Sequence, residues 1–264
     1  MYLNPSYTIQ FPEITEAIKD YYANVYNHDN LIKNRFKIQD RFIEDFVPWI
    51  NQGHIKFKGL KDFGYVYITN GVSEAITVCM LEHNLRPIVN KDDYPGYMCQ
   101  AIAFKDSLIT LRNRTKFLSL PYYNTADEHP DTIETLQEKS FIDLAWAGGS
   151  GLQKTYDVGK TEYVSFSFSK MFGIQYHRIG ILFSKKPIKT FDMFKKQGYV
   201  NLAGIDLIQH LMKFPPSYFY DKYRNTADAI CKRIGVETTK SLWFGLKDGV
   251  KVPLYDEWIN EKIK

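Results

Sequence analysis

The chain has 264 residues, of which 44% are hydrophobic and 24% are charged, and its formal net charge at pH 7 is +4. This composition is typical of a globular protein with a substantial packed core, and it excludes an intrinsically disordered chain. The small positive excess is spread along the sequence, so no nucleic acid and no membrane surface is expected as a partner.

Cysteine and histidine usage indicates neither disulfides nor a metal site. Cys79, Cys99 and Cys231 are odd in number and lack CxxC spacing, so we expect buried thiols in a reducing compartment. The six histidines show no paired spacing. The first residues lack the pattern of a signal peptide, and no window is long and apolar enough to span a membrane. We therefore expect a cytoplasmic protein.

The first sixty residues predict helices. Apolar residues recur at helical spacing on one face from Ile14 to Val25, including Tyr21 and Tyr22, and again from Ile38 to Ile50. Much of this surface is aromatic, so the helices are expected to pack on the main domain or on a second subunit.

From about residue 64, short apolar runs alternate with helix-like segments. This alternation predicts an α/β protein with a mostly parallel sheet that is covered by helices on both faces. The predicted strands are 65–69, 87–89, 108–111, 117–120, 141–146, 163–167 and 178–183. The predicted helices among them are 73–82 and 132–138, and further helices are predicted at 203–212 and 221–234.

The most informative motif is Ser167-Phe168-Ser169-Lys170, followed eight residues after the lysine by Arg178-Ile179-Gly180. An amine at the end of a rigid strand can form a Schiff base with an aldehyde. Hydroxyls and a guanidinium bind a phosphate dianion. These groups are the parts of a site for pyridoxal 5′-phosphate (PLP). The alternative is a surface lysine, with the arginine paired to a nearby acid.

Two further segments fit such a site. Asp143 lies inside the apolar run 141–146, and a carboxylate there is costly to bury unless it meets a cation. In a PLP enzyme that cation is the protonated pyridine nitrogen. The turn at 69–75, with Val72 and Ser73, ends a strand and begins a helix whose free N–H groups can bind an anion. The alternatives are a helix cap for the aspartate and an ordinary strand–turn–helix for the turn.

The lysine motif resembles the signature of class I/II aminotransferases, which are fold-type-I PLP enzymes of the aspartate aminotransferase superfamily. The positions that fit are Ser167, Phe168, Ser169, Lys170, Gly173, Ile174, Arg178, Ile179 and Gly180, whereas Tyr176 stands where a small residue is usual. The resemblance implies a mostly parallel seven-stranded sheet flanked by helices in a PLP-binding large domain at 61–185. It also implies a reduced small domain from an N-terminal helical segment at 1–60, which shares in dimer contacts, and a C-terminal helical segment at 186–264.

The resemblance also implies roles for individual residues. Lys170 holds PLP and transfers protons, and Asp143 keeps the pyridine nitrogen protonated. The phosphate is bound by Val72, Ser73, Ser167, Ser169 and Arg178. Tyr94, which precedes Pro95 in a turn with the family's aromatic-Pro-x-aromatic pattern, stacks on the ring; the alternative is a plain Pro-Gly turn. Asn124 and Trp146 stand near the cofactor's O3′ oxygen, but Asn124 lacks the family's following Pro and Gly, and Trp146 replaces a tyrosine.

One family element has no clear counterpart. An arginine late in the small domain usually binds the substrate carboxylate, and Arg224 and Arg233, the only arginines after Arg178, lie in no recognisable motif. We expect a homodimeric PLP-dependent aminotransferase that acts on a small-molecule amino donor and a keto acid. A lyase or decarboxylase of the same fold and a non-catalytic PLP-fold protein remain alternatives. A nucleotide-binding α/β protein is a third class, but it leaves Asp143 and Lys170 unexplained.

Overall fold

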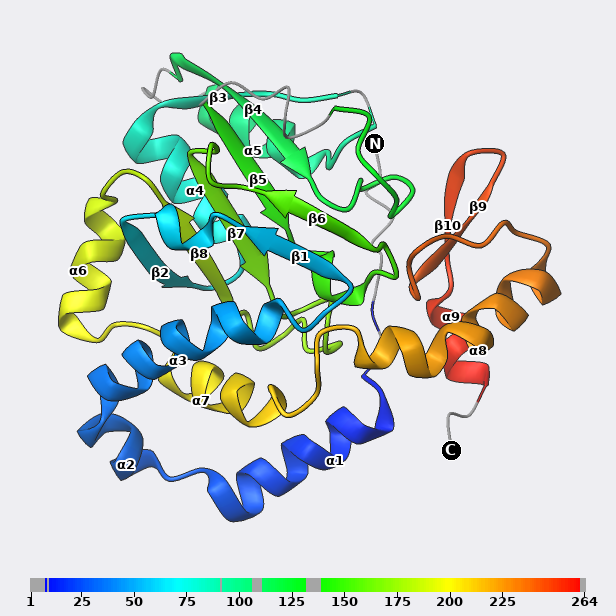
Figure 1. Ribbon diagram of the computed structural model, residues 1–264, viewed down its shortest axis with the longest axis horizontal. Coiled ribbons are helices and arrows are strands. Elements are labelled where there is room, and N and C mark those ends of the chain that lie inside the picture. The colour runs from blue at the N-terminus through cyan, green and yellow to red at the C-terminus, as the bar shows by residue number, and fades with distance from the viewer. Residues whose placement is uncertain (1–7, 9, 91, 106–110, 132–138, 262–264) are drawn as a thin grey trace.

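The computed structural model describes residues 8, 10–90, 92–105, 111–131 and 139–261. A six-stranded sheet lies at the centre of this part of the chain, in the order β2-β8-β7-β5-β4-β3 (Figure 1). Its strands are β2 (Tyr65–Thr69), β3 (Leu85–Ile88), β4 (Asn113–Ser119), β5 (Ser140–Leu144), β7 (Tyr163–Ser167) and β8 (Gly180–Ser184). Neighbours among β3, β4, β5 and β7 pair in parallel, and β8 is antiparallel to both β7 and β2. The sheet is therefore mixed, with only β8 reversed.

The prediction of a mostly parallel α/β sheet is confirmed. Six of the seven predicted strands are present, each within a few residues of its predicted bounds. The seventh, at 108–111, falls almost entirely outside the described residues, as does the predicted helix at 132–138. Both stay predictions.

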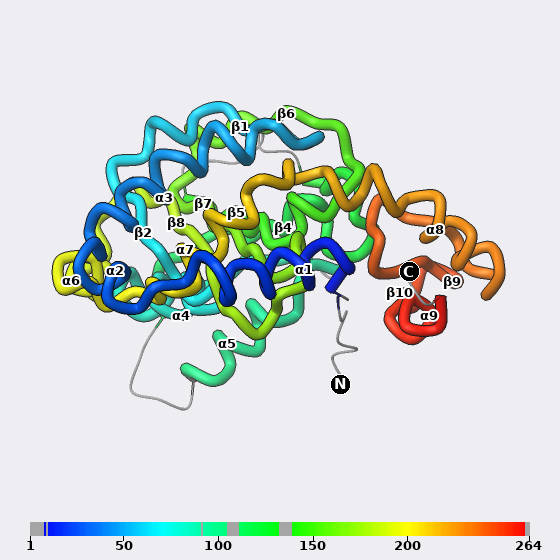
Figure 2. The backbone as a smooth tube through the Cα atoms, turned by 90° about the horizontal axis from the view of Figure 1, so that it is seen from below, coloured from blue at the N-terminus to red at the C-terminus, as the bar shows by residue number. Residues whose placement is uncertain are grey.

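Helices cover both faces of the sheet. On one face lies α3 (Arg35–Ile50), and on the other lie α4 (Val72–His83), α5 (Gly96–Lys105) and α6 (Lys189–Gln197) (Figures 1 and 2). Two separate clusters of buried side chains follow from this layering. Ile142 belongs to the α3 side and its neighbour Phe141 to the α4 side, because successive side chains of a strand point to opposite faces.

The remaining helices are assigned as follows. They are α1 (Pro12–Asp20), η1 (Tyr21–Val25), α2 (His28–Lys33), η2 (Leu60–Asp62), η4 (Ala147–Gly149), α7 (Leu202–Leu211), α8 (Tyr218–Ile234) and α9 (Tyr255–Asn260). The single apolar face predicted from Ile14 to Val25 is partly wrong. Tyr21 is buried, but Tyr22 is 49% and Val25 is 47% exposed, because the chain switches to a π-helical turn at Tyr21 and its side chains no longer follow the α-helical period.

Two small sheets were not predicted. β1 (Ile55–Lys58) pairs in parallel with β6 (Lys154–Asp157), and β9 (Phe244–Lys247) forms a hairpin with β10 (Val250–Pro253). The segment at 186–264, predicted as helical, does contain helices, but it also contains this hairpin. Asp248 and Gly249 form the hairpin turn with φ values of 53° and 74°, a conformation for which Asp-Gly is a favoured pair.

The beginning and the end of the described chain pack together. The ring of Phe11 stacks on Tyr223 of α8, with ring centroids 4.1 Å apart, and contacts Trp243 and Trp258. Figure 2 shows α8, α9 and the β9–β10 hairpin gathered at one end of the molecule. The domain boundaries at 60/61 and 185/186 stay predictions.

The cysteine prediction is partly wrong. All three cysteines are free, and Cys79 and Cys231 are buried, but Cys99 is exposed, because it lies on the solvent side of α5. Within the described ranges, no helix is both long enough and apolar enough to cross a membrane.

Candidate active site

The predicted site residues come together at one edge of the central sheet. Asp143 lies near the end of β5, Lys170 follows β7, Tyr94 follows β3, and Ser73 follows β2. Arg178 precedes the reversed strand β8, so it reaches the same edge. In open α/β sheets, ligands bind at this edge, outside the carboxyl ends of the parallel strands.

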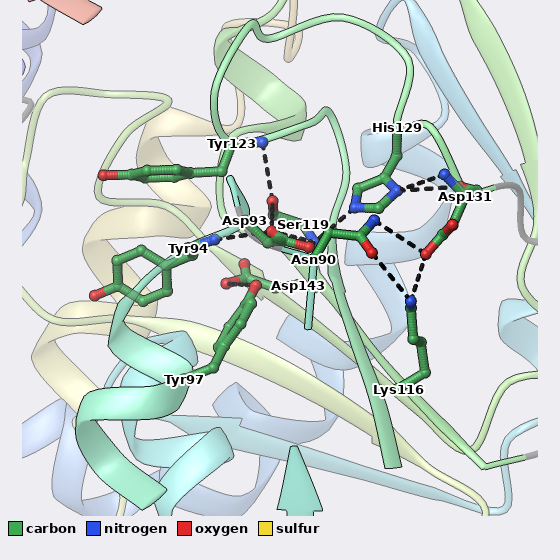
Figure 3. Close-up of polar contacts among 10 residues, drawn as sticks. All are labelled: Asn90, Asp93, Tyr94, Tyr97, Lys116, Ser119, Tyr123, His129, Asp131 and Asp143. Carbon is green, nitrogen blue, oxygen red and sulfur yellow. Dashed lines mark hydrogen bonds and ion pairs between the residues drawn. The ribbon is translucent and has the colours of Figure 1, made fainter. Parts of the chain in front are cut away.

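Asp143 is a buried carboxylate held by two donors. The Tyr97 hydroxyl donates to its Oδ2 at 2.9 Å (Figure 3). The backbone N–H of Ala145 donates to its Oδ1 at 2.8 Å. Burial is the main cause that raises the pKa of Asp143 to about 6, the charge of Asp93 raises it further, and the two hydrogen bonds oppose the rise. A carboxylate in this state gains stability from a cation placed beside it.

Lys170 lies in the turn after β7 and is partly buried. Burial first, and the charge of Arg178 second, lower the pKa of Lys170 to about 8. Its Nζ lies 5.1 Å from the ring centroid of Trp146, which follows β5. An amine with this pKa loses its proton far more readily than an exposed lysine, as a nucleophile or a general base requires.

Arg178 lies against the start of α4. A Cβ added to Gly71, the residue that precedes the helix, would lie 3.0 Å from a guanidinium nitrogen of Arg178. The φ of Gly71 is +90°, and no side chain caps the helix here, although Glu74 accepts hydrogen bonds from Asn70. The N–H groups at the start of α4, where Val72 and Ser73 lie, and the guanidinium thus share one location, which favours an anion such as a phosphate.

Gly180 permits this close approach. A Cβ at Gly180 would lie 2.8 Å from the Cα of Gly71 and 2.6 Å from the carbonyl oxygen of Phe166. Any larger residue would push β8 away from the turn after β2. The glycine of the signature therefore positions Arg178 beside the helix start.

Ser169 carries a buried hydroxyl for which the described residues offer no hydrogen-bond partner. Its backbone N–H donates to the Oγ of Ser167 at 3.2 Å, and both serines are buried. A buried hydroxyl without a partner is costly. An anion bound at this edge would satisfy the Ser169 hydroxyl.

Three tyrosine rings, those of Tyr94, Tyr97 and Tyr123, pack together beside Asp143. Tyr94 packs edge-on against Tyr97, with centroids 5.2 Å apart, and lies 5.3 Å from the ring of Tyr123 (Figure 3). Burial is the main cause that raises the pKa of Tyr94, and the charges of Asp143 and Arg178 act on it in opposite directions. Tyr94 is therefore close enough to feel both the carboxylate and the guanidinium. Asn124 follows Tyr123 in the same turn and is partly buried.

A buried hydrogen-bond network next to these tyrosines was not predicted. His129 Nε2 lies 2.9 Å from Asp93 Oδ2, and the Ser119 hydroxyl donates to Asp93 Oδ1 (Figure 3). The backbone N–H of Asp131 donates to His129 Nδ1 at 2.9 Å, so Nε2 carries the hydrogen that it donates to Asp93. The backbone N–H groups of Tyr94 and Tyr123 donate to Asp93 and Ser119, so the network positions both rings.

A second lysine near Lys170 was not predicted either. Lys251 of β10 lies with its Nζ 3.3 Å from the ring centroid of Tyr123 and 5.8 Å from that of Trp146. Both amines are thus near the ring of Trp146. The Asp-Gly turn before β10 was the one signal of a hairpin here, but nothing in the sequence places its lysine near Lys170.

The two candidate arginines for a substrate carboxylate are engaged elsewhere. Arg224 pairs with Asp228 and donates to the carbonyl oxygen of Thr239. Arg233 pairs with Glu257 and Glu261. In the part of the chain that the structure describes, no group of three histidine, cysteine or acidic side chains is placed to hold a metal ion.

No protein-family model matches the chain, and no curated protein matches it. Solved structures do. L-threonine-O-3-phosphate decarboxylase from Porphyromonas gingivalis is 13% identical, with a TM-score of 0.57 over 90% of this chain and 79% of that one. A methionine aminotransferase from Escherichia coli is 12% identical, with a TM-score of 0.57 over 99% and 82%. A PLP-bound C-S lyase from Staphylococcus hominis is 10% identical, with a TM-score of 0.55 over 87% and 67%.

These similarities establish the fold. The chain has the fold of type I PLP-dependent enzymes, as the resemblance of the lysine motif implies. The three similar proteins carry out decarboxylation, amino-group transfer and carbon–sulfur cleavage. One fold therefore supports several reactions, and the reaction of this chain depends on its own side chains.

Proposed function

We propose that this protein is a PLP-dependent aminotransferase that moves an amino group from a small amino donor to a keto acid. One observation carries the proposal: a buried acid on β5 and an amine after the adjacent strand β7 lie at the ligand-binding edge of this fold. The expected assembly is a homodimer, and the expected location is the cytoplasm.

The described residues fit PLP at each of its polar ends. Arg178, the start of α4 and the Ser169 hydroxyl without a partner suit a phosphate. Asp143 suits a protonated ring nitrogen, because a cation there would offset the cost of burying its charge. A nucleotide could use the phosphate-binding groups, but nucleotide binding would not explain why Asp143 and Lys170 lie together.

Bound PLP supplies an electron-withdrawing ring that stabilises negative charge at the substrate carbon. The protein holds and moves the proton. Lys170 Nζ, with its pKa lowered to about 8, can take a proton from a carbon atom and return it to another. With the cofactor bound, Tyr94 would cover one side of the site and help to exclude water, and the Asp143 carboxylate would bind the protonated ring nitrogen.

Amino-group transfer is proposed over the alternatives because the resemblance of the lysine motif is to aminotransferases. Because a lyase and a decarboxylase are among the similar structures, the test must also detect these two reactions. The assay therefore follows both the keto product of the amino donor and the products of carbon–carbon or carbon–sulfur cleavage.

The test combines covalent labelling with substrate screening. The purified protein is mixed with PLP, reduced with borohydride and digested, and the labelled peptide is identified by mass spectrometry. We expect the label on Lys170, its loss in Lys170→Ala, and its retention in Lys251→Met. A label on another lysine in the wild-type protein, or none, would contradict the proposal.

A panel of amino acids, each paired with a common keto acid, then tests the reaction. Transfer of the amino group by the wild-type protein and not by Lys170→Ala supports an aminotransferase. Cleavage products without transfer would replace it with a lyase or decarboxylase. Labelling of Lys170 without turnover of any donor would favour the non-catalytic alternative.

A further inference from the structure

Lys251 carries a charged group that the described protein leaves without a hydrogen-bond partner. Its Nζ is buried, and none of the described residues accepts a hydrogen bond from it. The rings of Tyr123, Phe244 and Trp146 surround it, with centroids 3.3, 4.3 and 5.8 Å away. Ring faces attract a cation, but they do not replace three hydrogen-bond acceptors.

The electrostatic surroundings of Lys251 also disfavour its charge. Burial is the main cause that lowers the pKa of Lys251 to about 7, and the charge of Lys170 lowers it further, whereas Asp93 acts in the opposite direction. The charge of Asp93 is already engaged by His129 and Ser119. An anion placed beside Lys251 would supply the missing acceptors and relieve the repulsion between the two lysines.

The position of Lys251 relates it to the proposed reaction. Both Lys170 and Lys251 contact the ring of Trp146, at 5.1 and 5.8 Å from its centroid. A molecule whose amino group reaches Lys170 therefore has Lys251 within the length of a small substrate. The arginines of the C-terminal segment cannot serve there, because Arg224 and Arg233 form ion pairs with acids of their own region.

We propose that Lys251 binds the carboxylate of the substrate, and that the substrate is therefore an amino acid and not a simple amine. The inference rests on the proposed function, because it concerns the substrate of the same site. The three rings around Nζ keep water away and strengthen the ion pair. They also offer an apolar surface, so a carboxylate with an aromatic remainder is a suitable probe.

The test compares 3-phenylpropionate with its neutral amide, 3-phenylpropionamide, by titration calorimetry, with and without PLP. The two probes differ mainly in charge, so their difference in affinity reports the ion pair. We expect the wild-type protein to bind the carboxylate at least roughly 30-fold more tightly than the amide, as a buried charge pair implies. Lys251→Met should lose this preference, and Lys251→Arg should keep it.

Lys247→Met is the matched control, because Lys247 belongs to the same hairpin and is exposed. It should bind both probes as the wild-type protein does. Thermal melts check that Lys251→Met is folded, which we expect because methionine has a similar length and suits an aromatic environment.

The two proposals fail in different ways. Equal affinity of the wild-type protein for the two probes, or an unchanged preference in Lys251→Met, would overturn the role of Lys251, even where PLP labels Lys170. Absence of a PLP label with a Lys251-dependent preference for the carboxylate would overturn the proposed function and leave the anion-binding role standing.

Discussion

The surroundings of Asp143 act on its ionisation in opposite directions. Burial and the carboxylate of Asp93 disfavour the ionised form, and the donors from Tyr97 and Ala145 favour it. The net result is a pKa of about 6, above the ordinary value of 3.8. The folded protein without a bound cation therefore loses stability when Asp143 ionises, which is the condition that a cationic ring nitrogen would relieve.

This shift predicts that Asp143→Asn stabilises the protein without cofactor at high pH. Because the folded state holds the proton more tightly than the unfolded state, wild-type stability falls as the pH rises from about 4 to 6. At pH 8 the free energy of unfolding of Asp143→Asn should exceed that of the wild type by up to about 3 kcal/mol, and the difference should vanish near pH 4. Urea denaturation at both pH values measures it. A difference independent of pH would show that the buried charge of Asp143 is not its cause, and Asp40→Asn, on the exposed side of α3, controls for the lost charge.

Helix α3 shows how an element is held over the face of the sheet opposite α4. Phe46 is fully buried, and its ring lies 4.9 Å from Phe166 of β7 and 6.0 Å from Phe183 of β8. Trp49 adds contacts with Phe168, just before Lys170. Strand β7 and the turn that carries Lys170 therefore depend on α3 for their packing.

Truncation of this contact predicts a large loss of stability. Phe46→Ala removes a buried ring and leaves a cavity, so the free energy of unfolding should fall by about 3–5 kcal/mol. Glu44→Ala on the same helix is the control, because Glu44 is exposed, and it should change stability by less than about 0.5 kcal/mol. Denaturant titration distinguishes the two. Equal effects would show that α3 does not support the sheet through Phe46.

At the scale of the whole molecule, the segment from η1 to the beginning of α3 exposes several large apolar side chains. They are Tyr22, Val25, Tyr26, Ile32 and Phe36. Single exposed apolar residues are common, but a group of them marks a contact surface in many proteins. The homodimer implied by the resemblance would give this N-terminal surface a partner.

We therefore predict a dimer in solution. Light scattering at micromolar concentration should give twice the chain mass of 30.9 kDa. Ile32→Lys, which places a charge on the 48% exposed Ile32, should weaken the dimer without unfolding the chain. A wild-type protein with the mass of one chain would contradict this assembly.

The central fold and the placement of Lys170 and Asp143 at one edge of the sheet were predictable from local patterns. Apolar runs of strand length indicated the sheet, because parallel strands buried on both faces are apolar throughout. Lys170, Arg178 and Gly180 belong to one short motif around the β7–β8 connection, and its residue types and its resemblance to the aminotransferase signature predicted a shared site. Asp143 stood out because a carboxylate inside an apolar strand is costly to bury without a partner.

Only the tertiary structure placed Lys251 and the Asp93–His129 pair near these residues. Lys251 lies on a strand far along the chain from Lys170, and its neighbours along the sequence resemble those of any surface lysine. Its burial depends on rings from three separate segments, and burial is a property of packing that no local pattern encodes. The sequence by itself determined the fold class and the amine–acid pair, whereas the packing of distant segments decided which other charges meet there.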